Sequence, residues 1–174
     1  MTVKKILTAP DPFLKQISKP VDEVTKEIQD LMDDMLDTMY DAPGIGLAAV
    51  QIGVPLRVIV MDISWRNEEG IKEPLYFVNP EITVKTKNLS TYEEGCLSVP
   101  DQYAEIDRPE ECEINFLDYN GKKSTLNAKG LLATCIQHEM DHLEGILFID
   151  HLSNMKRNMI CLLYTSDAAD EHSC

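Results

Sequence analysis

The chain has 174 residues, of which 44% are hydrophobic and 26% are charged, and its formal net charge is −14. This length suits one domain with a sizeable core, and the acidic balance disfavours direct binding of the domain to nucleic-acid phosphates. The sequence contains neither an apolar stretch long enough for a membrane span nor the apolar block of a secretory signal, so we expect one cytoplasmic domain without a membrane anchor.

The first predicted element is an amphipathic helix. Between Val24 and Tyr40, apolar residues recur at helical spacing with acidic residues between them. Asp22 is the expected N-cap, and Pro43-Gly44 would end the helix. The methionines of this segment are expected to fill the core.

Short β-rich segments follow at 57–63, 75–78, 81–86, 113–118 and 124–126, with Asn120-Gly121 as a hairpin turn. A second helix is predicted from Leu131 to Leu143, entered after Gly130 and closed near Gly145. This order predicts an α+β fold. In it, antiparallel sheets pack around the second helix, with an N-terminal helix and a truncated C-terminal helix that begins within 152–160.

The C-terminal segment differs from the rest of the chain. Residues 161–171 read CLLYTSDAADE, which has no periodicity and resembles the translated end of a transposon-type sequencing adapter. We therefore predict that residues 1–160 form the domain and that 161–174 are a non-native tail. The alternative is a genuine variable tail.

The sharpest chemical signal is an HExxH motif at residues 138–142. His138 and His142 are one helical turn apart on the same face, so both imidazoles can reach one metal ion. Glu139, between them, can take a proton from an activated water. The alternative is two surface histidines beside a solvated glutamate.

The third metal ligand must come from elsewhere. In the metzincin extension of the motif a third histidine would stand where this chain has Phe148, so that interpretation fails. Cys96 is the best candidate, because the neighbouring Gly95 lets the backbone approach closely. A lone cysteine is more often a small buried hydrophobe, and Cys112 and Cys135 are interpreted in that way.

A third segment, GIGLAAVQ at residues 44–51, has two glycines after the first helix. A phosphate-binding loop is disfavoured, because no Lys-Ser/Thr follows and no strand–glycine–helix unit surrounds it. Its small residues, ending in Gln51, suit close packing beside a site with one amide directed inward.

GIGLAAVQ, EGCLSVP and QHEMDH, in this order and spacing, resemble the three signature motifs of the peptide deformylases, in their bacterial-type form. The resemblance extends from the N-terminus to about Leu152. It implies a metal-dependent hydrolase that removes the formyl group from the N-terminal methionine of new polypeptides and releases formate.

The resemblance also implies a metal site. Cys96, His138 and His142 would bind one divalent ion and leave a fourth position for water, while Glu139 would act as general base and acid. Ferrous iron is the expected native metal, with zinc or nickel as replacements, and the sequence does not choose between them.

Other residues would handle the substrate. The Gln51 amide and the Leu97 backbone N–H would stabilise the oxyanion, and Gly46 would bind the extended peptide. The remaining substrate-binding candidates, several of which could equally be core residues, are Ile45, Gly95, Leu132, Cys135 and Ile136, with His138 beside them in the methionine slot.

Two departures from the family pattern stand out. Tyr103 occupies a position where familiar bacterial relatives often carry arginine, so contacts with the peptide backbone or a carboxylate can differ there. Arg108 remains as a nearby base, and the alternative is that it is solvated, as most arginines are. In some relatives a basic C-terminal helix docks on the ribosome, whereas only Lys156 and Arg157 remain here, so this C-terminus disfavours ribosome association. The expected partners are N-formylmethionyl peptides, and a monomer is expected.

Two competing hypotheses remain. A zinc endopeptidase of the HExxH kind would share the helix but need a carboxylate or histidine as third ligand. A catalytically idle binding module would have little use for Glu139.

Overall fold

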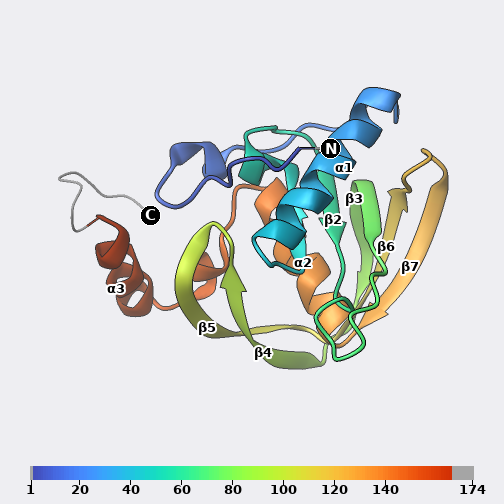
Figure 1. The fold of residues 1–174 in the computed structure, drawn as a ribbon. Helices are drawn as coiled ribbons and strands as arrows, with labels where there is room; N and C mark the ends of the chain where they lie inside the picture. The colour runs from blue at the N-terminus through green and yellow to red at the C-terminus, as the bar shows by residue number, and fades with distance from the viewer. Residues whose placement is uncertain (1, 166–174) are drawn as a thin grey trace.

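The computed structural model describes residues 2–165, and it has the predicted α+β architecture (Figure 1). The helices are α1 (Lys26–Asp41), α2 (Leu131–Leu143) and α3 (Asn154–Thr165), with short 3₁₀ helices at Pro12–Lys15, Ala49–Ile52 and Phe148–His151. The strands are β1 (Gly46–Ala48), β2 (Val58–Met61), β3 (Leu75–Lys85), β4 (Leu89–Cys96), β5 (Val99–Pro109), β6 (Glu111–Leu117) and β7 (Lys123–Lys129).

The strands form two antiparallel sheets. The larger has five strands in the order β1-β2-β3-β6-β7, so β1 lies at one edge, and β4 and β5 form a separate hairpin. The predicted segments 75–78 and 81–86 are one strand, β3, whose pairing with β6 is irregular between Val78 and Glu81.

The hydrophobic pattern does not predict β4 and β5. Their outward face carries charged residues such as Glu93 and Glu105, which are exposed. Their inward face carries buried Glu94 and Arg108 beside Ile106. Because both faces are charged, the alternation of apolar and polar residues that marks a strand is missing.

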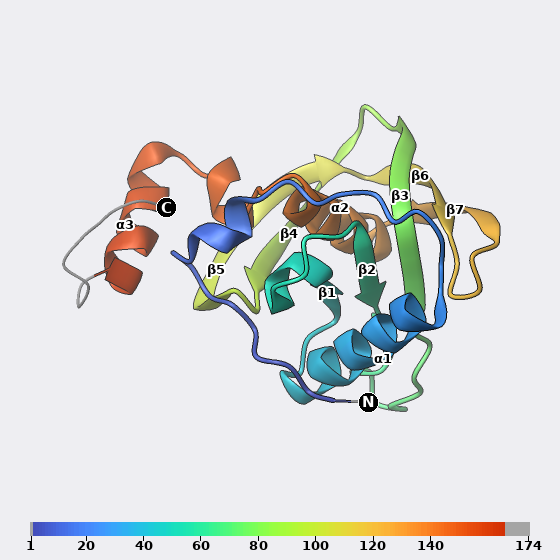
Figure 2. The same ribbon diagram turned by 90° about the horizontal axis from the view of Figure 1, so that it is seen from above.

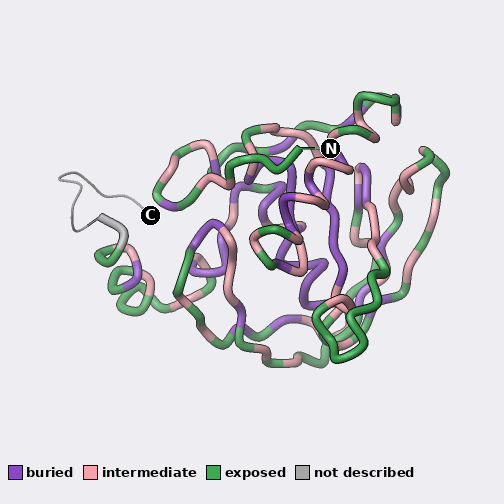
Figure 3. The backbone as a smooth tube through the Cα atoms, in the orientation of Figure 1, coloured by how far each residue is buried: buried purple, intermediate pink, exposed green. Residues whose placement is uncertain are grey.

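Helices cover both faces of the larger sheet, and β2 shows this most clearly. Val58 and Val60 pack with α1, in the same core cluster as Met35. Ile59 and Met61 point to the opposite face and pack in the cluster that contains α2. All four residues of β2 are buried, which explains the continuous apolar run in the sequence (Figure 3).

The start of α1 differs from the prediction. Its N-cap is Thr25, whose hydroxyl accepts a hydrogen bond from the Ile28 backbone N–H at 3.4 Å. Val24, predicted to be helical, instead lies before the helix and packs against the core, and Asp22 lies three residues before the N-cap, so it does not cap the helix. The prediction that the methionines fill the core is confirmed, since Met32, Met35 and Met39 are fully buried.

Helix α2 has the predicted bounds and contacts both the five-stranded sheet and β5 (Figures 1 and 2). The helix that carries the HExxH motif is therefore enclosed by both sheets.

Helix α3 lies at one side of the molecule and contacts the 3₁₀ helix Phe148–His151 (Figure 2). It continues through residues 161–165 of the predicted tail, and 166–174 lie outside the described residues. That residues 161–174 are non-native thus stays a prediction. Among residues 2–165, no helix is long and apolar enough to cross a membrane.

Gly145, just after α2, should be intolerant of a side chain. Its φ is +73°, and a Cβ there would lie 2.4 Å from the Lys15 carbonyl oxygen. Gly70 has a similar φ of +62° but open space around it. We expect Gly70→Ala to lower the free energy of unfolding by about 1–2 kcal/mol through backbone strain alone. Gly145→Ala should cost roughly 1–3 kcal/mol more, because of the added clash.

Urea denaturation of the two variants and the parent protein measures this difference. Equal losses would show that the contact with Lys15 does not constrain Gly145.

Candidate metal centre

Three potential metal ligands from distant parts of the chain meet inside the molecule. His138 and His142 lie one turn apart on α2, and Cys96 is the last residue of β4. Their donor atoms all lie within 4.8 Å of one another, and the Cys96 sulfur is 3.3 Å from His142 Nε2. Cys112 and Cys135 are free thiols outside this group.

The hairpin directs the sulfur of Cys96 toward α2. The β4–β5 register shifts between Gly95 and Cys96, where the strand turns. The Ser98 backbone N–H donates to the sulfur at 3.4 Å, and Gln51 Nε2 donates to it at 3.6 Å. These two contacts orient the sulfur, and the thiolate is the form of cysteine that binds metals.

A buried network of charged side chains holds His138. Its Nδ1 is 2.9 Å from Oε1 of Glu94. Arg108 donates to both oxygens of that carboxylate, at 2.6 and 2.9 Å, and to Oδ2 of Asp141 at 2.9 Å. The same Asp141 oxygen is 2.7 Å from Nε2 of His151. Because Glu94 engages Nδ1 of His138, Nε2 is the nitrogen left for a metal.

The alternative in which Arg108 is solvated is wrong, since only 5% of its surface is exposed. It lies on β5 two residues from buried Ile106, so both point inward. This alternation is the one sequence signal that could have indicated a buried Arg108. The signal is weak, because the sequence does not show which carboxylate would pair with a buried arginine. Sequence reasoning also missed Glu94 as the partner of His138.

The electrostatics of this region favour a cation. Burial raises the pKa of Glu94, but hydrogen bonds with His138 and Arg108 outweigh it, and the pKa falls below its ordinary value. Burial lowers the pKa of His138, but hydrogen bonds with Cys96 and Glu94 prevail and hold it well above its ordinary value. Such a shift marks an anionic environment. Burial lowers the pKa of His142, which keeps that imidazole neutral, as metal binding requires.

The donor set fits a metal ion in a catalytic setting. One thiolate and two imidazoles are three protein ligands, whereas structural zinc sites are almost always closed by four. Thiolate and imidazole suit zinc and iron, and imidazole also suits nickel. The group can therefore hold one divalent ion whose identity the donors do not fix.

Glu139 lies beside these ligands and faces a cavity. Its side chain is buried, and its Oε2 has no hydrogen-bond partner among the described residues. Burial raises the pKa of Glu139 to about 7, a value suited to accepting and returning a proton near neutrality. Gly46 permits this placement, because a Cβ there would lie 2.6 Å from Oε1 of Glu139.

The side-chain amide of Gln51 is oriented by its neighbours. Its Oε1 accepts from the Ala48 backbone N–H at 2.9 Å, and its Nε2 donates to Ser98 Oγ at 3.0 Å. The NH₂ group therefore faces the segment that contains Cys96. Gln51 and Leu97, the residue after Cys96, both line the cavity.

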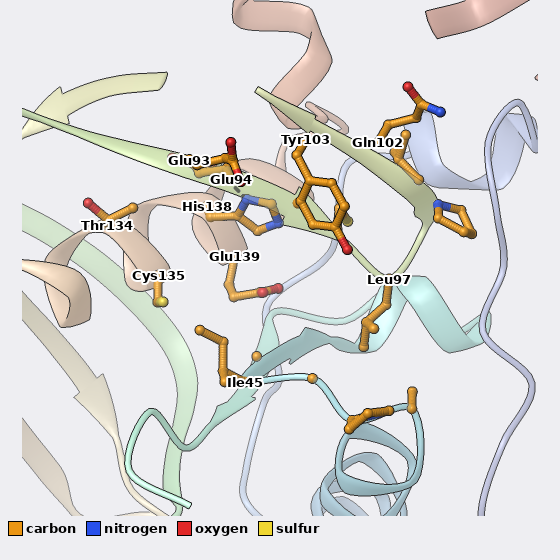
Figure 4. Close-up of a pocket in the computed structure, with 18 of the residues that line it drawn as sticks. Ile45, Glu93, Glu94, Leu97, Gln102, Tyr103, Thr134, Cys135, His138 and Glu139 are labelled. Atoms are coloured by element: carbon orange, nitrogen blue, oxygen red, sulfur yellow. Dashed lines mark hydrogen bonds and ion pairs between the residues drawn. The ribbon is translucent and has the colours of Figure 1, made fainter. Parts of the chain in front are cut away.

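The cavity has a volume of about 680 Å³ and lies between β1, α2 and the hairpin (Figure 4). Figure 4 shows Glu139 reaching into it from α2, with Ile45 on the side of β1 and Tyr103 on the side of the hairpin. The predicted substrate-binding residues that line it are Ile45, Gly46, Gly95 and Cys135.

Leu132 and Ile136 do not line the cavity, contrary to the prediction. Both pack into the core between α2 and the larger sheet. The face of α2 that lines the cavity carries Leu131 and Thr134 instead. Helical spacing gives two candidate faces, and the sequence alone did not establish which of them faces the cavity.

The chain is similar to several known proteins, which share one family description. The family model described as polypeptide deformylase matches residues 3–158. A peptide deformylase of Pelagibacter ubique is 69% identical over 160 residues, which are 92% of this chain and 92% of that protein. A peptide deformylase of Agrobacterium fabrum is 54% identical over 168 residues, which are 97% of this chain and 98% of that protein. The crystal structure of peptide deformylase from Ehrlichia chaffeensis in complex with actinonin has a TM-score of 0.90 and 39% identity, covering 98% of this chain and 100% of that one.

Replacing Glu94 by glutamine should weaken metal binding. The neutral amide is a poorer acceptor for Nδ1–H of His138 and leaves Arg108 without its buried anion. Loss of such a partner typically lowers metal affinity about 10- to 100-fold. Titration of the metal-free variant with zinc against a fluorescent chelator measures the change.

Glu105→Gln is the matched control, because it makes the same substitution on the same hairpin at an exposed position. Equal affinities for both variants would mean that the Glu94 contact does not support the metal.

Proposed function

The chain belongs to the polypeptide deformylase family, and from this premise we propose how its own residues carry out the reaction. The protein is a metal-dependent hydrolase that removes the N-formyl group from N-formylmethionyl polypeptides. The observation that carries the proposal is the convergence of Cys96, His138 and His142 beside Glu139 in one cavity.

Cys96, His138 and His142 would hold one divalent ion, which would supply Lewis-acid activation of water and of the formyl carbonyl. The resemblance to the family favours ferrous iron as the native metal, and the same donors accept zinc or nickel. With iron, exposure to oxygen would threaten the Cys96 thiolate by oxidation.

Glu139 would move the proton. It accepts a proton from the attacking water and delivers it to the amine nitrogen of methionine as the bond from that nitrogen to the formyl carbon breaks. Formate and the free N-terminus are then the products. The burial of Glu139, its unpartnered Oε2 and its pKa of about 7 support this role.

Gln51 and Leu97 would stabilise the oxyanion that develops on the formyl oxygen. The Gln51 NH₂ group already faces the ligand segment, and Leu97 follows Cys96 directly. Each such donor typically lowers the barrier by about 2.7–4 kcal/mol.

The peptide would lie along β1. This strand is an edge of the larger sheet, and its first residue, Gly46, lines the cavity. An extended peptide can add to such an edge through backbone hydrogen bonds. Gly95 lines the same cavity from the hairpin wall, and Ile45 and Cys135 would contact the methionine side chain.

We further propose that the protein is cytoplasmic, because its substrates are nascent chains, and that it acts as a monomer, because one chain supplies the three potential ligands and Glu139. Ribosome association is not expected to be strong, since the basic residues of α3 are Lys156 and Arg157. An HExxH endopeptidase is not favoured, because the third potential ligand is a thiolate and the chain matches the deformylase family.

Glu139→Gln should abolish activity while leaving the metal bound. The amide cannot accept a proton, so formate release from formyl-Met-Ala-Ser should fall at least about 100-fold. The assay uses protein purified without oxygen, with metal content measured in parallel. Acetyl-Met-Ala-Ser, with a larger acyl group, should yield no free amine.

Wild-type protein loaded with metal that releases no formate would contradict the deformylase assignment. A fully active Glu139→Gln variant would contradict the assignment of Glu139.

A further inference from the structure

The substrate cavity contains an arginine, Arg66, that the mechanism above does not use. Among the described residues that line the cavity, Arg66 is the only lysine or arginine. Two exposed acids, Glu93 and Asp101, lie on the hairpin wall of the same cavity. The cavity is therefore acidic on one wall and basic at one point.

Arg66 belongs to the loop between β2 and β3, and the base of this loop is firmly anchored. Asp62 is fully buried, and its Oδ1 accepts from the backbone N–H groups of Ser64 at 3.0 Å and Trp65 at 3.2 Å. Its Oδ2 accepts from the Tyr40 hydroxyl at 2.6 Å and the Glu73 backbone N–H at 2.8 Å. One carboxylate thus fixes both ends of the loop.

The loop is also attached to the wall where the peptide would bind. Trp65 Nε1 donates to the Gly44 carbonyl at 3.0 Å, and the Trp65 ring packs edge-on against Tyr40 at 5.1 Å. Gly44 lies two residues before Gly46, which begins the edge strand β1. Arg66, next to Trp65, is consequently held beside the path of the peptide.

The guanidinium of Arg66 is available to a ligand. Arg66 is exposed, and among residues 2–165 no carboxylate forms an ion pair with it. A guanidinium presents a planar set of N–H donors that matches a carboxylate in two parallel hydrogen bonds. In a chain with a net charge of −14, an unpaired arginine in the binding cavity is a local exception to the acidic surface.

We propose that Arg66 is a specificity-determining residue that binds a carboxylate of the substrate beyond the formylated methionine. This inference rests on the proposed function. Glu93 and Asp101 would repel the same carboxylate from the hairpin wall, so Arg66 would be the residue of the cavity that pairs with it. The carboxylate can come from an aspartate or glutamate that follows methionine, or from the C-terminus of a short peptide.

The effect should be modest and should act on binding. A solvent-exposed ion pair corresponds to about a 1.5- to 5-fold preference in kcat/KM. It should appear in KM, because the carboxylate lies away from the bond that breaks. Added salt should reduce it, since exposed charges are screened.

Two substrate pairs separate the sources of the carboxylate. Formyl-Met-Asp-Ser amide against formyl-Met-Asn-Ser amide tests the side chain, and formyl-Met-Ala-Ser against its C-terminal amide tests the terminus. Each ratio of kcat/KM is measured for the wild type, Arg66→Gln and Lys72→Gln. Lys72 is the matched control, because it lies exposed on the same loop, over the Tyr40 ring, and does not line the cavity.

We expect the wild type and Lys72→Gln to prefer the carboxylate in at least one pair, and Arg66→Gln to lose that preference. Ratios that are the same in the wild type and Arg66→Gln would overturn the proposal, as would an equal loss in Lys72→Gln.

A binding measurement keeps this test separate from the proposed function. Trp65 is the single tryptophan of the chain, so its fluorescence can report peptide binding in metal-loaded Glu139→Gln protein. Carboxylate-dependent binding that requires Arg66, without formate release by the wild type, would support this inference and contradict the function. Formate release by the wild type, with peptide binding that does not depend on Arg66, would support the function and contradict this inference.

Discussion

The ion pair between Glu94 and Arg108 is the interaction on which the site depends. Both side chains are buried, and their hydrogen bonds join β4 and β5 to His138 and Asp141 of α2. Cys96 follows Glu94 by two residues, so a hairpin held in this way also holds the thiolate beside His142. Removing one partner of a buried ion pair typically costs about 3–5 kcal/mol, because the other charge is left unpaired. The network therefore couples the stability of the hairpin to the geometry of the ligands.

The cavity is built from elements with different mechanical roles. Helix α2, enclosed by both sheets, supplies two ligands and Glu139 from a rigid support. The strand β1 lies at the edge of the larger sheet, where an extended peptide can add, and Gly46 brings its backbone close to Glu139. The hairpin closes the opposite side with Cys96. A substrate lying between β1 and the hairpin would thus have its formyl group beside the ligands and the rest of its chain directed along the loop of Arg66.

The sequence predicts the parts of this arrangement that follow from local periodicity. The bounds of α2 and the shared face of His138 and His142 come from helical spacing, and the buried methionines of α1 from its amphipathic pattern. The hairpin is not predictable in this way, because it buries the charged residues Glu94 and Arg108. A charged residue is expected at the surface unless the partner that allows its burial is known. Leu132 and Ile136 were open to either of two faces of α2, and only the packing against the larger sheet places them in the core.

The most direct test of the central claim is X-ray absorption spectroscopy of the zinc-loaded protein, with Cys96→Ser as the comparison. The account predicts one sulfur ligand at about 2.3 Å and two imidazole nitrogens at about 2.0–2.1 Å in the wild type, and loss of the sulfur shell in the variant. A wild-type spectrum without a sulfur ligand, or one unchanged by the substitution, would contradict it.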